Sequence, residues 1–342
     1  DLLRRAMSHF DPGKRMQELQ QKFVSESEAR SGIPQETGER VWEMMAAFAG
    51  YGFPKAHAAS YAQIAWRSAW AKVHFPAEFM AAVLANGGGY YSQRVYLSES
   101  RRLGLAVQAP HINYSSHNFS VTSVSGEKQL FMGLEQVKHL TRKTIRKIIA
   151  MRPYHSLDDF LTRVDPRLQE VENLVKIGAL EGLGSIPALL KRLQSGWQAG
   201  QMSLFSMDAG AGKDWSLEEK MSAQQEILGV SLAAHPLELV ADRIKKAGAI
   251  EIAEAVERIG QRVTVTGVRQ TSRRSRTAKG ETMLFLTLED LSGTLDVIVF
   301  PDLYRKVNQV AMSNQPMLIT GVLEIDKGRE EPTLKAEKIV GL

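Results

Sequence analysis

The chain contains no cysteine among its 342 residues, so disulfide bonds and thiolate metal sites are both excluded. A cysteine-free composition is typical of a reducing compartment, and we take the cytoplasm as the expected location. No stretch approaches the roughly 18 consecutive apolar residues of a membrane-spanning helix, and no signal-peptide pattern opens the sequence. We therefore expect no membrane partner.

The sequence also lacks a recognisable metal centre. Its eight histidines are scattered without the spacing of metal ligands. A two-metal catalytic site needs a group of carboxylates, yet no Asp-x-Asp pair stands on an expected strand. Asp158 and Asp159 lie in a helical context and Asp290 follows a strand, without a third carboxylate nearby in a motif. We expect neither a metal ligand set nor catalytic residues within this chain.

The net charge is small, because 43 lysines and arginines face 38 aspartates and glutamates, for a formal charge of +5. A charge of this size permits an anionic partner but does not identify one. The local clusters of charge therefore matter more than the total. The chain also begins "DLLRRAM", with a helical pattern already running and no initiator methionine, so we expect it to be a piece of a longer protein.

The length predicts several domains, and the hydrophobic pattern changes along the chain. The spacing of apolar residues predicts a helical domain to about residue 115, in which Pro76 starts a new helix. Short strands followed by helices form a second unit over 116–195, and a Gly-, Ser- and Met-containing linker covers 196–214. A helical connector over 215–255 precedes five short alternating strands over 256–342, which favour a β-barrel of OB type. The expected fold class is multidomain α+β.

Two stretches near the start of the chain carry candidate phosphate ligands. Arg4 and Arg5 form either a solvated helix face or a clamp for a polyphosphate, because paired guanidiniums make several charge-assisted hydrogen bonds. "AGYGFPKAHAASYA" places Lys55 and His57 after a glycine-containing turn, at an expected helix start. That position suits an anion, although a turn between helices with polar surface residues explains the spacing equally well.

The sequence around these residues resembles that of a known protein family. "LRRAM" followed by "FAGYGFPKAHAASYAQIAWRSAWAKVHFPAEFMAAVL" is similar to the fingers region of bacterial C-family DNA polymerases, the alpha subunit of DNA polymerase III and its error-prone relatives. The sequence departs from the replicative enzymes at Pro54, where they usually carry asparagine. It departs again after Met7, where "SHFDPGK" replaces Gly-Lys-Lys. The sequence does not decide between the replicative and the error-prone branch.

This resemblance implies specific roles. Arg4 and Arg5 occupy the positions of an arginine pair that approaches the triphosphate of the incoming nucleotide, and Lys55 and His57 are candidates for nucleotide or template contacts. The parent reaction would be template-directed transfer of a deoxynucleotide to a primer 3′ end. Its Mg²⁺ ions would be held by palm aspartates that precede the fingers in the family, outside this chain, so the chain alone is expected to be inactive.

The next part of the chain resembles a tandem helix-hairpin-helix unit. "LFMGLEQVKHLTRKTIRKIIAMR" and "LVKIGALEGLGSIPALLKRL" correspond to its two halves. Such a hairpin grips duplex DNA through backbone N–H groups at a tight turn and basic side chains on the following helix. "VKHLTR" lacks the glycines that allow close approach, whereas the second half has them, and a helical domain with a solvated basic face is the alternative. The candidate DNA ligands are Lys138, Arg142, Lys143, Arg146, Lys147, Gly182 and Gly184.

The linker contains "QMSLF", a short peptide suited to docking in a partner's groove. A glutamine can bond at the rim while Leu204 and Phe205 fill an apolar pocket. Its position after the hairpin unit resembles the internal site by which the family binds the sliding clamp, although exposed apolar residues also occur in linkers by chance. The expected clamp-binding residues are Gln201, Met202, Ser203, Leu204 and Phe205. Other polymerase or mutasome subunits are further expected partners.

The five-stranded region opens with the basic text "RQTSRRSRTAKG". In an OB fold, the loop between the first two strands flanks the nucleic-acid-binding face, so we place these cations in that loop. Phe285 and Phe300 offer stacking surface, although alternation assigns at least one of them to the core. Solvation of the loop is the alternative to single-strand binding. The candidate ligands are Arg269, Arg273, Arg274, Arg276 and Lys279.

Two other functions fit parts of this pattern. The first is a non-enzymatic accessory protein that binds DNA and docks on the clamp, with a merely structural fingers-like domain. The second is an RNA-binding OB protein, which would leave "QMSLF" and the fingers-like text unexplained.

Overall fold

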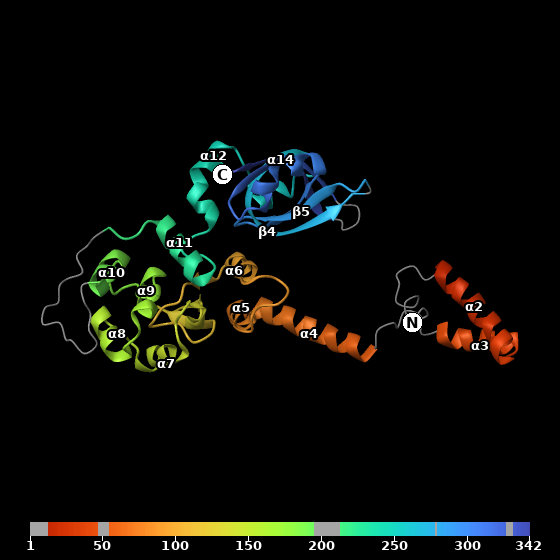
Figure 1. Ribbon diagram of the computed structural model, residues 1–342, viewed down its shortest axis with the longest axis horizontal. Coiled ribbons are helices and arrows are strands. Elements are labelled where there is room, and N and C mark those ends of the chain that lie inside the picture. Colours follow the sequence, from red (N-terminus) through yellow and green to blue (C-terminus); the bar gives the residue numbers. More distant parts are fainter. Residues whose placement is uncertain (1–12, 47–54, 195–212, 278, 326–330) are drawn as a thin grey trace. The chain divides into compact units, whose positions relative to one another are not determined.

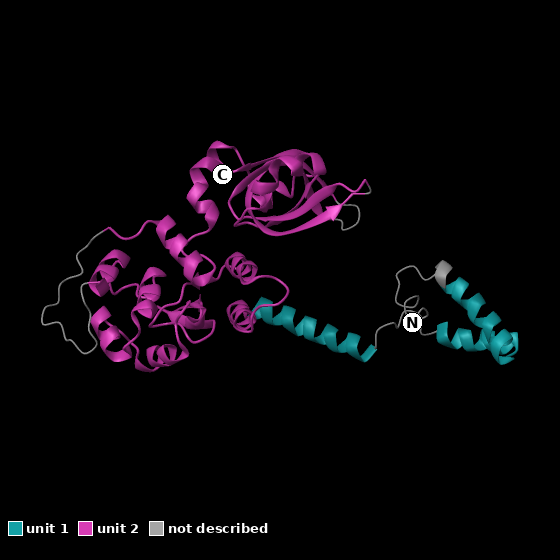
Figure 2. Ribbon diagram, viewed as in Figure 1, with its two compact units in different colours: residues 1–74 teal, residues 75–342 magenta. Residues whose placement is uncertain are grey.

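The computed structural model describes residues 13–46, 55–194, 213–277, 279–325 and 331–342. The chain divides into two compact units, residues 1–74 and residues 75–342 (Figure 2).

The described part of the first unit is helical. Helices α2 and α3 pack against each other, with the rings of Phe23 and Trp42 5.7 Å apart and Trp42 buried. Helix α4 buries none of its side chains. The helices of this unit are α2 (Gly13–Ser31), α3 (Gln35–Ala46) and α4 (Lys55–His74).

The second unit begins with two helices and a small sheet. Pro76 is the first residue of α5, which confirms the helix start predicted from the sequence and fits the fixed φ of proline. The sheet has the order β1-β3-β2, in which β3 pairs parallel with β1 and antiparallel with β2. Strand β1 is too short for its alternation to be read from the sequence. These elements are α5 (Pro76–Ala85), α6 (Gln93–Arg102), β1 (Ala106–Gln108), β2 (Ser120–Val124) and β3 (Glu127–Phe131).

A group of short helices follows the sheet and shares its hydrophobic core (Figure 1). These helices turn apolar residues inward at three- and four-residue spacing, as α7 does with Ile145 and Ile148 and α8 with Leu157 and Leu161. The elements are η1 (Leu134–Gln136), α7 (Arg142–Met151), α8 (Leu157–Val164), α9 (Leu168–Lys176) and α10 (Ile186–Gln194).

The segment that leads to the barrel is helical. Helix α11 begins with a capping box between Ser216 and Glu219 and ends at Gly229, whose φ of 75° is the left-handed conformation that glycine adopts most readily. The connector consists of α11 (Leu217–Leu228), η2 (Pro236–Val240), α12 (Ala241–Lys246) and α13 (Ile252–Ala255).

The C-terminal domain is a closed barrel of five strands in the order β4-β5-β6-β8-β7, which confirms the predicted OB-type barrel and the α+β fold class. Leu284, Leu286 and Leu288 alternate inward and are fully or almost fully buried. Gly321 permits strand closure, because a Cβ there would lie 2.1 Å from the carbonyl oxygen of Lys335. The elements are β4 (Arg262–Arg276), β5 (Thr282–Glu289), β6 (Thr294–Val299), α14 (Pro301–Met312), β7 (Met317–Ile325) and β8 (Pro332–Gly341).

Candidate nucleic-acid interface

The first hairpin is formed by η1, a short turn and the start of α7. His139 in this turn has a φ of 66°, the left-handed conformation for which a glycine would be expected. Thr141 caps α7, because its Oγ1 accepts a hydrogen bond from the backbone N–H of Thr144 at 3.3 Å. The turn therefore reaches the geometry of a tight hairpin without the glycines that the sequence lacks.

A buried carboxylate holds this turn in place. Glu170 on α9 is 2% exposed and accepts hydrogen bonds from the backbone N–H groups of Thr141, at 2.9 Å, and Arg167, at 2.8 Å. It also accepts one from Oγ1 of Thr144 at 2.9 Å. Burial alone would raise the pKa of Glu170, but these hydrogen bonds outweigh it and lower the pKa. The hairpin turn is thus fixed by an ionised group beneath it.

The basic residues of α7 divide into two sets. Arg142, Lys143 and Arg146 are exposed and lie in the first half of the helix. Lys147 donates from Nζ to the carbonyl oxygen of Val164 at 2.8 Å, and Lys138 in the preceding turn donates to the carbonyl oxygen of Glu226. The exposed set can approach a phosphate backbone directly, whereas Lys138 and Lys147 also tie the turn and the helix to their neighbours.

The second hairpin connects α9 to α10. Gly182 and Gly184 have φ values of 87° and 152°, so both adopt conformations that other residues rarely reach. The backbone N–H of Ile186, at the start of α10, donates to Oδ1 of Asp214 at 2.9 Å. Burial alone would raise the pKa of Asp214, but Lys220 and the N–H of Ile186 outweigh it and lower the pKa. The carboxylate of Asp214, from the same chain, therefore occupies the position at the start of α10 where a phosphate oxygen would otherwise bind.

The barrel arginines lie on a strand and not in a loop, which corrects the placement expected from the sequence. Strand β4 continues to Arg276, so only Lys279 among these cations lies in the turn before β5. Arg273 pairs across the strands with Phe285, and its guanidinium carbon is 5.5 Å from the ring centre. Arg274 and Arg276 are exposed further along β4. The turn is short because pairing between β4 and β5 extends well beyond the barrel wall.

Both candidate stacking residues lie outside the barrel core. Phe285 is half-buried beside Arg273, and Phe300 is 44% exposed. The expectation that alternation places one of them in the core is wrong, because Leu284, Leu286 and Val299 take the inward positions instead. The pair of Arg273 and Phe285 offers a cation and an aromatic ring on one surface, which is the combination that single-stranded nucleic acid favours.

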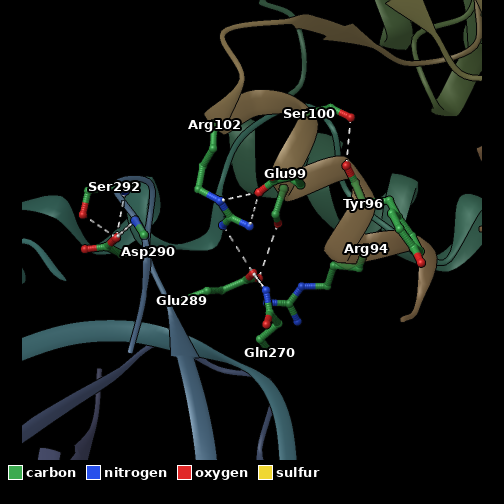
Figure 3. Close-up of polar contacts among 11 residues, drawn as sticks. Arg94, Tyr96, Glu99, Ser100, Arg102, Gln270, Glu289, Asp290 and Ser292 are labelled. Atoms are coloured by element: carbon green, nitrogen blue, oxygen red, sulfur yellow. Dashed lines mark hydrogen bonds and ion pairs between the residues drawn. The ribbon is translucent and has the colours of Figure 1, made fainter. Parts of the chain in front are cut away.

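A polar cluster joins α6 to the barrel (Figure 3). Glu289 at the end of β5 is fully buried, and its Oε1 accepts a hydrogen bond from Arg94 at 3.0 Å and from Ser98 at 3.4 Å. Its Oε2 accepts from Gln270 of β4 at 3.0 Å and lies 3.9 Å from Nη1 of Arg102. The carboxylate is thereby shared between two arginines of α6 and an amide of the barrel.

Sequence reasoning did not identify Glu289 or Asp214. Glu289 follows the alternation of β5 on the outward positions, which predicts exposure, and it is buried only because α6 covers it. Asp214 is far from Ile186 in sequence, so a contact between them has no local pattern. The one sequence signal for Glu289 was the pair of adjacent acidic residues, Glu289 and Asp290, at the end of an alternating strand.

The remaining candidate residues are placed as follows. Lys55 and His57 are exposed in the first turn of α4. Arg4, Arg5 and the clamp-binding candidates Gln201–Phe205 lie outside the residues that the structure describes. Across the described ranges, no helix is long and apolar enough to span a bilayer, and no three His, Asp or Glu side chains gather as metal ligands.

Comparison with protein families matches two parts of the chain. Residues 104–188 match the model of a helix-hairpin-helix motif, and residues 263–341 match that of an OB-fold nucleic acid binding domain. These ranges contain the hairpin formed by η1 and α7 and the barrel from β4 to β8.

Longer matches extend over almost the whole chain. An error-prone DNA polymerase of Corynebacterium efficiens is 32% identical over 336 residues, which cover 95% of this chain and 30% of that protein. The DNA polymerase III subunit alpha of Thermus aquaticus is 33% identical over 361 residues, covering 96% of this chain and 28% of that protein. The chain thus spans about 30% of the length of these relatives. It is homologous to a segment of the bacterial C-family DNA polymerases, as its sequence resemblance predicted.

Proposed function

We propose that this chain is the nucleic-acid-binding part of a DNA-directed DNA polymerase, in which the hairpin unit holds the duplex and the barrel holds single-stranded template. The observation that carries the proposal is the surface of β4 and β5. On one face of these paired strands the guanidinium carbon of Arg273 lies 5.5 Å from the ring centre of Phe285, and the exposed Arg274 and Arg276 of the same strand lie on the opposite face, because side chains alternate along a strand. Cations that track phosphates beside a ring that stacks bases suit a single strand without sequence preference.

The exposed basic side chains of α7 support a separate role in duplex binding. Arg142, Lys143 and Arg146 follow directly after a turn that Glu170 holds rigid. Phosphate contacts of this kind position a duplex without reading its sequence. A polymerase needs such sequence-independent contacts, because every primer terminus must be accepted.

The remaining parts of the proposal follow the polymerase relatives. The parent enzyme would transfer a deoxynucleotide to the primer 3′ end with loss of pyrophosphate, and Arg4, Arg5, Lys55 and His57 would contact the incoming nucleotide. Following the resemblance to the polymerases, we assign the ligands of the Mg²⁺ ions to palm aspartates outside this chain; in the described ranges no three His, Asp or Glu side chains gather as metal ligands. We assign docking on a sliding clamp to the peptide Gln201–Phe205.

The central test replaces Arg273, Arg274 and Arg276 by glutamine in the 342-residue chain. Binding of a fluorescein-labelled oligodeoxythymidine is measured by anisotropy across a salt series. We expect weaker binding and a shallower salt dependence, with the slope reduced by about 0.7 for each phosphate that is no longer neutralised. The control replaces the exposed Arg243, Lys245 and Lys246 of α12 by glutamine, which changes the net charge equally. An unchanged slope, or an equal change in the control, would show that the β4 arginines are only solvated.

A further inference from the structure

A groove runs between α6, the connector and the barrel, beside the Glu289 cluster. Its volume is about 710 Å³, within the range of roughly 300–1,000 Å³ that is usual for ligand sites. Arg94 and Arg101 of α6 line it from one side and Arg269 of β4 from the other, while Glu218 is the acidic residue on its lining. The described walls therefore carry a net positive charge.

The three arginines are held in fixed positions. Arg94 donates to Glu289 at 3.0 Å, and Arg101 donates to the carbonyl oxygen of Leu232 at 2.8 Å. Arg269 donates to the carbonyl oxygen of Ser313 at 3.2 Å and to the side chain of Asn314 at 2.7 Å. A guanidinium has more N–H donors than the contacts of Arg94 and Arg101 use, so both can still bind an anion. Their orientation is set before any ligand arrives, which reduces the entropy lost on binding.

The lining also indicates which part of a ligand is recognised. No phenylalanine, tyrosine or tryptophan lines the groove in the described structure, so it offers no large ring on which a base can stack. It offers guanidiniums together with the hydroxyl and amide groups of Ser222, Asn314 and Gln315. These groups suit phosphate oxygens and sugars more than bases.

The groove borders the strand that carries the barrel arginines. Arg269 and Gln270 line the groove, and the same strand then presents Arg273, Arg274 and Arg276. A strand of nucleic acid fits this arrangement better than an acidic peptide, because the ring of Phe285 beside Arg273 can stack a base while the arginines contact phosphates. We propose that the groove binds the sugar-phosphate backbone of single-stranded nucleic acid leaving the β4 surface. The inference rests on the proposed single-strand binding and adds a second contact region to it.

The test places two negative charges in the groove without removing a described hydrogen bond of the arginines. Ser222 on α11 and Gln315 before β7 are exposed, so Ser222→Glu combined with Gln315→Glu should preserve the fold. The matched control is Asn308→Asp combined with Gln309→Glu on α14, two exposed positions outside the groove. Both variants carry the same change in net charge, and circular dichroism compares their folding.

Binding is measured by anisotropy with labelled oligodeoxythymidines of about 8 and about 24 nucleotides, since an OB fold occupies roughly 4–16 nucleotides. We expect the groove variant to weaken binding of the long strand about fivefold or more at low salt, with little change for the short one. The control variant should bind both oligonucleotides with affinities within about twofold of those of the wild type.

Three outcomes would overturn the inference. Equal loss in the groove variant and in the control would show an effect of net charge alone. An unchanged long-strand affinity would show that the groove does not contact the strand. A polyglutamate peptide that competes better than the oligonucleotide would assign the groove to an acidic protein segment. The triple substitution on β4 tests single-strand binding itself, so failure of the groove alone leaves the proposed function standing.

Discussion

Arg94 and Glu289 are joined by a 3.0 Å ion pair in which the carboxylate side chain is completely buried and the arginine is 31% exposed. The pair links a helix of the N-terminal part of the second unit to the last residue of a barrel strand. Removing one partner of a buried pair leaves the other charge without compensation, which commonly costs about 3–5 kcal/mol. We therefore expect the contact between α6 and the barrel to depend strongly on Glu289.

We expect Glu289→Ala to loosen this junction. Hydrogen exchange measured by mass spectrometry should increase in the peptide containing α6 and at the end of β5, while the interior of the barrel stays protected. Glu281→Gln is the control, because its ion pair with Arg305 joins side chains that are 45% and 64% exposed and contributes little. Unchanged exchange in α6 would contradict the assigned role of Glu289.

His235 should make stability depend on pH. Burial lowers the pKa of His235, Arg101 and Arg94 lower it further, and Glu289 and Glu238 oppose the shift. The unfolded chain then takes up a proton below the ordinary pKa of 6.5 while the folded chain does not. The stability contributed by neutral His235 is complete above that pH and is lost as the pH falls towards the folded pKa.

The measurement compares thermal unfolding of the wild type and His235→Asn between about pH 7.5 and 5. Asparagine can still accept the hydrogen bond that Nδ1 of His235 takes from the backbone N–H of Leu237. We expect the wild type to lose stability more steeply than the variant, by up to about 1.4 kcal/mol per pH unit. His111, whose pKa burial also lowers, is present in both proteins and cancels. Parallel curves would show that His235 does not titrate in this window.

The hairpin turn should fail when Glu170 is removed. Glu170→Ala leaves the part-buried N–H groups of Thr141 and Arg167 without their acceptor; the cost is about 1–3 kcal/mol for a fully buried group and smaller for a part-buried one. We expect a lower urea midpoint and weaker binding of a blunt duplex. The control is Glu172→Ala on the same helix, a half-buried side chain outside the turn. Duplex affinity that survives the removal of Glu170 would show that the turn does not position the phosphate contacts.

The clamp-binding peptide can be tested without knowledge of its conformation. Leu204→Ala combined with Phe205→Ala removes the two apolar side chains that would fill a pocket on the clamp. We expect pull-down of a bacterial sliding clamp to be abolished while affinity for an oligonucleotide is unchanged. Retained capture of the clamp would reject the assignment of this peptide.

Local sequence patterns predicted the barrel well because its inward residues alternate and its turns contain glycine and proline. Leu284, Leu286 and Leu288 show this period directly, and their burial confirms it. The same pattern could not show where β4 ends, because "RRSR" lacks the apolar alternation of a strand with one buried face. Beyond Val268 none of the side chains of β4 is buried, so apolar alternation is not required there, and Arg273 and Arg274 remain in the strand through pairing with β5.

The parts of the candidate site that depend on contacts between distant segments were not predictable. His139 adopts a left-handed conformation close to Thr141. The backbone N–H of Thr141 is in turn held by Glu170, which belongs to α9. Residue types identified the exposed cations of α7. They did not show that Lys138 and Lys147 differ from the others by binding main-chain carbonyl oxygens. These differences between basic residues arise from tertiary packing, which the sequence pattern alone does not reveal.

The length of β4 has one further consequence, for self-association. Its pairing with β7 covers Arg262–Gly267, so the extension towards Arg276 is bonded along one side to β5 and leaves the backbone groups of the other side without a strand partner among the described residues. An unpaired edge of this kind invites pairing with a second copy of the same ribbon. Because the extension carries Arg273, Arg274 and Arg276, two copies would bring like charges together. The arginines thereby oppose self-pairing of the ribbon while leaving it open to a polyanion.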